Sequence, residues 1–72
     1  MDKQQIKRAL YKVNNNAEFI NVTHVAAVLG IRPETTQANY LQSLEYLPNG
    51  RGKLYLVDDV ADAICSAKKK AE

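Results

Sequence analysis

The first thirteen residues place apolar and polar side chains with the period of a helix. Ile6, Leu10 and Val13 recur at helical spacing together with Ala9, whereas the other side of the wheel carries Lys7, Arg8, Tyr11 and Lys12. We therefore predict a helix from Asp2 to about Val13. The asparagines at positions 14–16 follow it, and their short amide side chains compete with helical hydrogen bonds. They should end this helix in a turn.

Two further helices are predicted between residues 21 and 46, with Phe19 and Ile20 entering the core ahead of them. Asn21 is a favourable N-cap for a short helix through residue 29, and Gly30 can end that helix in the left-handed conformation. Pro33 suits the first turn of a third helix over residues 33–46. The helical wheel gives an apolar side formed by Thr36, Tyr40, Leu41, Leu44 and Leu47. The opposite side is polar and mostly uncharged and is formed by Thr35, Ala38, Asn39 and Gln42.

The period of the pattern changes from about 3.6 to about 2 residues over positions 47–56. Asn49-Gly50 is a strong tight-turn signal, and Leu54 and Leu56 alternate with polar neighbours at 53 and 55, as in a half-buried strand. We predict a small β-hairpin with a basic tip. Asp58 should then cap a last helix with an apolar stripe of Val60, Ala63, Ile64 and Ala67. The charges at its two ends complement the helix dipole: Asp59 and Asp62 in the first turns, and Lys68, Lys69 and Lys70 in the last.

The length and composition restrict the classes of protein that fit. The 72 residues make one small domain, 1–72, and 46% hydrophobic with 25% charged residues is a globular composition, so we expect the chain to fold. One cysteine, Cys65, and one histidine, His24, exclude a disulfide scaffold and a zinc finger. Because no apolar run reaches the roughly 18 residues of a membrane span and the start is not that of a signal peptide, we expect a soluble, cytoplasmic protein with no membrane partner.

The charges are distributed unevenly along the chain. Ten basic and eight acidic residues give a net charge of +2, which only mildly favours an anionic partner. Three of the acids gather at positions 58, 59 and 62, so we expect basic stretches elsewhere to be unneutralised by near neighbours. Catalysis has little support: the two serines are far from His24 in sequence, and no glycine-rich phosphate loop is present. We predict a non-enzymatic protein with no cofactor and no metal.

The order of the predicted elements is that of a winged helix-turn-helix. Residues 21–35 resemble the helix-turn-helix opening of excisionase-like and MerR-like DNA-binding proteins, which has a capping residue, an alanine on the helix, a Leu-Gly-aliphatic turn and a Pro-x-Thr start to the recognition helix. Residues 50–55 and 57–60 resemble their wing and the Asp-Val helix behind it, so the resemblance covers about residues 19–65. It implies a mainly α fold with a small β-hairpin, the winged helix-turn-helix.

In a helix-turn-helix the exposed face of the second helix enters the major groove, where the base edges present hydrogen-bond donors and acceptors. Asn39 and Gln42 carry amides suited to bidentate contact with adenine, and Gln37 could do likewise from the rim. Ala38 can meet a thymine methyl group. At the start of the same helix, Thr35 can bond a phosphate and Arg32 adds positive charge.

Basic residues outside the recognition helix supply the remaining candidate contacts. Arg51 and Lys53, held between and beside glycines at the wing tip, suit the minor groove or the DNA backbone. Lys7, Arg8 and Lys12 are candidates for phosphate contacts from the first helix. The lysines at 68–70 suit either a solvated helix end or DNA.

Two functions follow from these features. The leading hypothesis is a small sequence-specific protein that binds double-stranded DNA, either an excisionase-like factor that bends DNA for a recombinase or a compact phage or plasmid regulator. Its partners would then include a recombinase or further copies of itself on adjacent sites. The alternative is a winged-helix interaction module that docks onto a recombinase, polymerase or packaging enzyme, which Glu34 and Glu45 beside the near-neutral helix face would favour.

Overall fold

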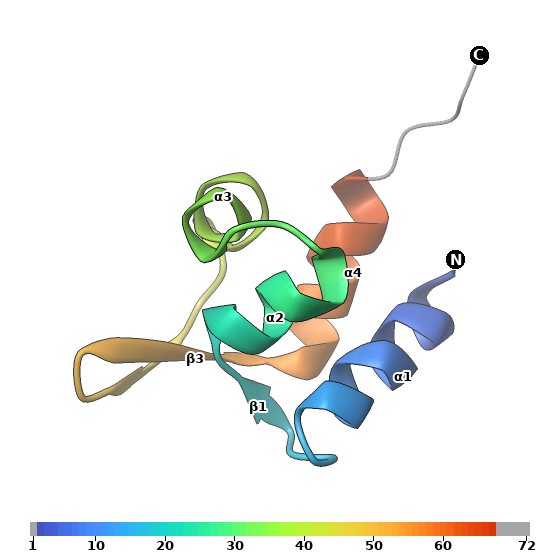
Figure 1. Ribbon diagram of the computed structural model, residues 1–72, viewed down its shortest axis with the longest axis horizontal. Helices are drawn as coiled ribbons and strands as arrows, with labels where there is room; N and C mark the ends of the chain where they lie inside the picture. The colour runs from blue at the N-terminus through green and yellow to red at the C-terminus, as the bar shows by residue number, and fades with distance from the viewer. Residues whose placement is uncertain (1, 68–72) are drawn as a thin grey trace.

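The computed structural model describes residues 2–67, and the predicted lysine-rich helix end at 68–70 lies outside that range. The described chain is mainly helical with a small three-stranded antiparallel sheet (Figure 1). Its elements are α1 (Lys3–Val13), β1 (Phe19–Ile20), α2 (Val22–Leu29), α3 (Pro33–Thr36), the π-helical turn η1 (Gln37–Leu41), β2 (Leu47–Asn49), β3 (Gly52–Leu56) and α4 (Val57–Ala67).

The predicted start and end of the first helix are confirmed. A carboxylate oxygen of Asp2 accepts a hydrogen bond from the Gln5 amide at 3.0 Å, and the Gln5 side chain accepts one from the Asp2 amide at 2.9 Å. This reciprocal pair satisfies two amides that the first turn would leave free. Asn14 ends the helix, and Asn15 and Asn16 follow with φ of 53° and 61°. Asparagine tolerates this left-handed region better than other non-glycine residues, so the triplet makes the turn.

The boundaries of the next two helices also follow the predicted signals. The Asn21 side chain accepts a hydrogen bond from the His24 amide at 2.9 Å, which caps α2. Gly30 ends α2 with φ of 72°, and its amide donates to the Ala26 carbonyl at 2.8 Å. Pro33 lies in the first turn of α3. The tight turn between α2 and α3 therefore depends on a glycine that no other residue replaces without strain.

The third helix is shorter than predicted. It becomes a π-helical turn at Gln37 and ends at Leu41, so the expected span of 33–46 is wrong beyond that point. Leu47 belongs to β2 and is exposed instead of completing an apolar helix side. Pro48 gives a physical reason, because a residue that precedes proline is restricted to extended backbone. Leu47 can then pair with Leu54 across the hairpin.

The sheet contains one strand more than the predicted hairpin. Its order is β1-β3-β2, and the pairing of β1 with β3 places Phe19 opposite Leu56 and Ile20 opposite Tyr55. Tyr55 is buried with 1% exposure, whereas Leu54 and Leu56 are only half-buried. The expected alternation, with leucines inward and Tyr55 outward, is therefore reversed. Leu54 and Leu56 lie on the outer face of the sheet.

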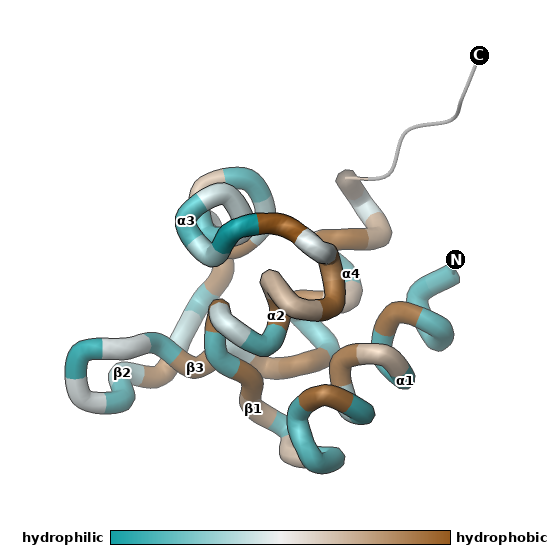
Figure 2. The backbone as a smooth tube through the Cα atoms, in the orientation of Figure 1, coloured by the Kyte–Doolittle hydropathy of each residue, from teal (hydrophilic) through white to brown (hydrophobic). Residues whose placement is uncertain are grey.

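The core lies between the helices and the inner face of the sheet. It is formed by Ile6, Leu10, Ile20, Val25, Leu41, Tyr55, Val57, Val60, Ala61 and Ile64. Hydrophobic stretches from α1, α2, β3 and α4 supply most of it (Figure 2). The buried positions Leu10 and Ile64 bring the first and last described helices into one cluster, so both ends of the described chain hold the fold together.

The last helix begins earlier than predicted. It starts at Val57, directly after β3, so Asp58 lies inside the first turn and is not the N-cap. The amide of Val57 donates instead to the Glu18 carbonyl at 2.9 Å. The buried stripe includes Val60 and Ile64 as expected, but the small residue that completes it is Ala61. The other two alanines of the predicted stripe, Ala63 and Ala67, are half-buried and exposed.

Candidate nucleic-acid interface

The predicted polar side of the third helix faces solvent. Thr35, Ala38, Asn39 and Gln42 are all exposed. Their neighbours Thr36 and Leu41 are fully buried and hold this segment on the core. We call the four exposed residues the recognition face. They present two amides, one hydroxyl and one methyl group to solvent, which is chemistry that can contact base edges in a major groove.

Two features fix the start of the segment that carries the recognition face. The Thr36 hydroxyl donates to the Arg32 carbonyl at 3.0 Å, so a buried polar group is satisfied within the first turn. The Thr36 amide also donates to the Arg32 carbonyl, at 2.9 Å. Arg32 itself is exposed, and within residues 2–67 its guanidinium takes part in no ion pair, so the cation at the start of the helix could contact a phosphate.

The π-helical turn was not predicted from the sequence. Residues 37–41 follow i→i+5 bonding, which is rare, occurs mostly as single turns within α-helices and is frequent at functional sites. A helical wheel drawn with α spacing does not apply to this turn, so the angular positions of Ala38 and Asn39 differ from those on the predicted wheel. Both nevertheless remain exposed.

Gln37 has a different position from the other predicted base contacts. It is half-buried, and its side-chain nitrogen donates to the phenol oxygen of Tyr55 at 2.8 Å. The bond connects residues 33–42, the recognition segment that carries the recognition face, to β3 in the core. Gln37 therefore supports the recognition face from below, and one of its two donors is already used inside the fold.

The two basic residues of the hairpin, Arg51 and Lys53, are both exposed, and their neighbours differ. Asn49 pairs with Gly52, and the two loop residues are Gly50, with φ of 61°, and Arg51 at the exposed tip. A glycine with positive φ at the first loop position is the requirement of a type II′ hairpin turn. The Lys53 ammonium lies 4.6 Å from the centre of the Tyr46 ring, a cation–π contact that restrains this side chain.

The basic residues of α1 are not all free. The Lys7 ammonium lies 3.2 Å from an Asp58 carboxylate oxygen, and Lys3 lies 3.4 Å from the same oxygen. Lys3 also reaches Asp62 at 3.8 Å. The hydrogen bond from Lys7, with a second from Lys3, lowers the pKa of Asp58. The expectation that the acidic cluster leaves the basic stretches unneutralised is therefore wrong for Lys3 and Lys7.

The phosphate-contact candidates on α1 consequently divide into two groups. Lys7 takes part in the ion pair with Asp58, while Arg8 and Lys12 are exposed. Tyr11, expected on the polar side with them, is half-buried against the core and donates to Glu18 at 3.2 Å. Partial burial of the phenol raises the pKa of Tyr11, and the nearby Glu18 carboxylate raises it further. Its role is to connect α1 to the segment before β1.

His24 and Cys65 both contact other parts of the fold. The Nδ1 atom of His24 lies 3.0 Å from the Asn14 side-chain oxygen, which joins the start of α2 to the end of α1. Cys65 is half-buried against the core. Within residues 2–67, no group of three or more histidine, cysteine, aspartate or glutamate side chains is placed to hold a metal ion.

No protein-family profile, curated protein or solved structure matches the chain. Within residues 2–67 no helix has both the length and the apolar character needed to span a bilayer.

Proposed function

We propose that this chain is a small winged helix-turn-helix protein that binds specific sequences in double-stranded DNA, acting as an excisionase-like architectural factor or a compact regulator. The observation that carries the proposal is the exposed pair of amides, Asn39 and Gln42, on a short helical segment that follows a glycine turn. Asparagine and glutamine read adenine through two hydrogen bonds at once.

The hairpin supports the same function from a second position. Arg51 lies exposed at the tip, where a two-residue loop after Gly50 presents it. An arginine on a narrow loop suits a minor groove or a phosphate beside the groove that the helix enters. Arg32 adds another exposed cation, at the start of the helix. Helix and loop would thus contact neighbouring parts of one duplex.

The charge balance predicts moderate affinity for a single copy. Glu34 and Glu45 are exposed on either side of the recognition face and repel phosphates, and Lys7 is neutralised within the fold. Cooperative occupation of adjacent sites would then raise the effective affinity. A steep dependence of binding on protein concentration is the expected sign of such cooperation.

The experiment measures fluorescence anisotropy of labelled duplexes over a range of salt concentrations. A duplex from the region upstream of the gene is compared with random duplex, and specific recognition predicts at least ~10³-fold tighter binding to the former. Asn39→Ala or Gln42→Ala should cost about 1–3 kcal/mol on the specific site and almost nothing on random DNA. Gln4→Ala, an exposed amide on α1, is the matched control.

The contribution of the hairpin is tested separately. Arg51→Ala should weaken binding to both duplexes and reduce the slope of log affinity against log salt by about 0.9, the effect of one phosphate. Arg51→Lys keeps the charge and should restore that slope. Absence of binding to either duplex at low salt would overturn the proposed function.

A further inference from the structure

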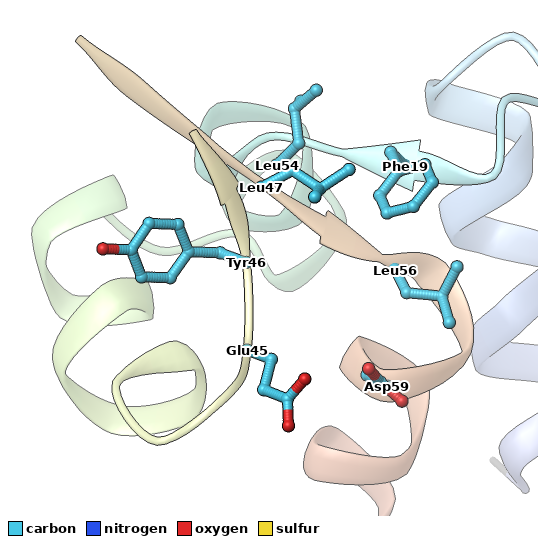
Figure 3. A pocket seen from close by; sticks show the side chains of 7 residues that line it. All are labelled: Phe19, Glu45, Tyr46, Leu47, Leu54, Leu56 and Asp59. Carbon is cyan, nitrogen blue, oxygen red and sulfur yellow. The ribbon is translucent and has the colours of Figure 1, made fainter. Parts of the chain in front are cut away.

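The outer face of the small sheet is apolar, although no helix in the described part of the chain, residues 2–67, covers it (Figure 3). The strand register places Phe19 opposite Leu56 and Leu47 opposite Leu54. Leu54 and Leu56 are two residues apart in β3, so all four side chains share one face of the sheet. Figure 3 shows these four side chains gathered on one side of the strands. Leu47 is 50% exposed and Phe19 is 39% exposed. A sheet face in contact with water ordinarily carries polar side chains.

This apolar face is hollowed into a pocket of about 220 Å³. A cavity of about 150 Å³ is large enough to hold benzene, so the pocket has room for one bulky apolar side chain. We call the site the outer-face pocket. It is lined by Phe19, Glu45, Tyr46, Leu47, Leu54, Leu56 and Asp59.

One end of the outer-face pocket is acidic. Glu45 and Asp59 both line the pocket, and Figure 3 shows their carboxylates below the leucines, whereas the Tyr46 ring points away from them. The ion pairs within residues 2–67 are made by Asp58 and Asp62, and neither Glu45 nor Asp59 takes part in one. A ligand that fills the apolar part of the pocket therefore meets two carboxylates that can accept hydrogen bonds from a cation.

The β2 edge of the sheet is unsuited to addition of a strand, which favours docking by side chains there. β2 is the edge strand beside β3, and it is three residues long with Pro48 at its centre. Proline cannot donate a backbone hydrogen bond, and it is a common means of preventing strand pairing at an edge.

We propose that the outer-face pocket binds a segment of another protein that inserts one bulky apolar side chain and places a lysine or arginine against Glu45 and Asp59. The charge complementarity selects this occupant. An anionic lipid surface would be repelled by the two carboxylates. A second copy packed through the same face would bring four carboxylates into the contact, and among residues 2–67 the pocket lining includes no cation to offset them. None of the four residues of the recognition face lines the pocket, although Glu45 borders both surfaces.

The test selects binding peptides from a displayed library of random linear sequences on the full chain. Enriched peptides should carry a leucine, isoleucine, methionine or aromatic residue within a few positions of a lysine or arginine. Their synthetic versions should bind Leu47→Ser about tenfold or more weakly than the parent chain. Ile31→Ser, which removes a comparably exposed apolar side chain outside the pocket, should keep full affinity.

Charge reversal supplies the second arm. Glu45 lies between η1 and β2, outside both, so Glu45→Lys should retain the fold. Peptides selected on this variant should lose the preference for a lysine or arginine near the apolar residue. Circular dichroism confirms that each variant folds, and DNA affinity of Leu47→Ser should equal that of the parent chain. Peptides without the basic residue, or peptides that bind Leu47→Ser as tightly as the parent, would overturn the proposal. So would sedimentation showing a dimer that Leu47→Ser dissociates, because the occupant would then be a second copy.

Discussion

Replacing Tyr55 with phenylalanine tests whether the recognition segment is held to the core by one hydrogen bond. The phenol oxygen accepts from the Gln37 side chain at 2.8 Å, and the tyrosine is 1% exposed. Tyr55→Phe removes only the hydroxyl group and no carbon atom, so the packing of the ring is kept. A net hydrogen bond between neutral groups contributes about 0.5–1.5 kcal/mol.

The expected loss of unfolding free energy is about 1 kcal/mol, because Gln37 is only half-buried and its amide regains some contact with water. For a domain of this size, such a loss lowers the melting temperature by about 4–8 °C. Urea unfolding followed by circular dichroism measures it. Tyr46→Phe is the matched control: Tyr46 is 49% exposed, and its variant should stay within about 0.5 kcal/mol of the parent.

A double-mutant cycle separates this bond from other effects of the substitution. Gln37→Met keeps the length of the side chain and removes its donor, and combining it with Tyr55→Phe should cost clearly less than the sum of the single changes. A coupling free energy below about 0.3 kcal/mol, within the error of simple additivity, would refute the reasoning. Equal urea midpoints for Tyr55→Phe and Tyr46→Phe would refute it as well.

Three further predictions concern the turns and the ion pairs. Gly30→Ala should destabilise the chain by about 1 kcal/mol through its φ of 72° alone, because a Cβ there meets nothing within 4 Å, and Gly30→Asn should cost less in the same urea measurement. Asn21→Ala removes the cap of α2 and should lower the unfolding free energy by about 1 kcal/mol. Folding lowers the pKa of Asp58 from its ordinary value of 3.8. The Asp58 carboxylate therefore stabilises the folded chain above pH 3.8, and this contribution is lost as the pH falls through the lowered pKa of the folded state. Lys7→Met should reduce this acid-side loss in pH-dependent melting curves, and an unchanged curve would contradict the ion pair.

The turns of this fold were predictable because they depend on local chemistry. Asn21, Gly30 and Pro33 each act within a few residues, through a side-chain cap, a left-handed φ and a fixed φ, and each takes its predicted place. The exposed positions of Asn39 and Gln42 follow for a related reason. Polar side chains opposite buried neighbours on one short helical segment have few alternatives to solvent.

The features that the sequence did not reveal depend on contacts between distant residues. β1 is two residues long and exists through its pairing with β3, so no periodicity could indicate it. Tyr55 is buried because Gln37 satisfies its hydroxyl, and the ion pair of Lys7 with Asp58 joins residues far apart in the chain. A wheel or a count of neighbouring charges contains none of this information.

The packing of α1 against α4 has a consequence for how the chain acquires its structure during synthesis. Leu10 and Ile64 belong to one core, and β1 pairs with β3, which lies more than thirty residues later in the chain. Closing such long loops precedes most of the stabilising contacts, so we expect one cooperative folding step that waits for the last helix. A ribosome-bound chain that has exposed residues 33–42 but not 57–67 would display the right amino acids without the geometry that aligns them. Incomplete chains and chains cleaved before α4 should therefore not compete with the finished protein for the DNA sites that we propose it binds.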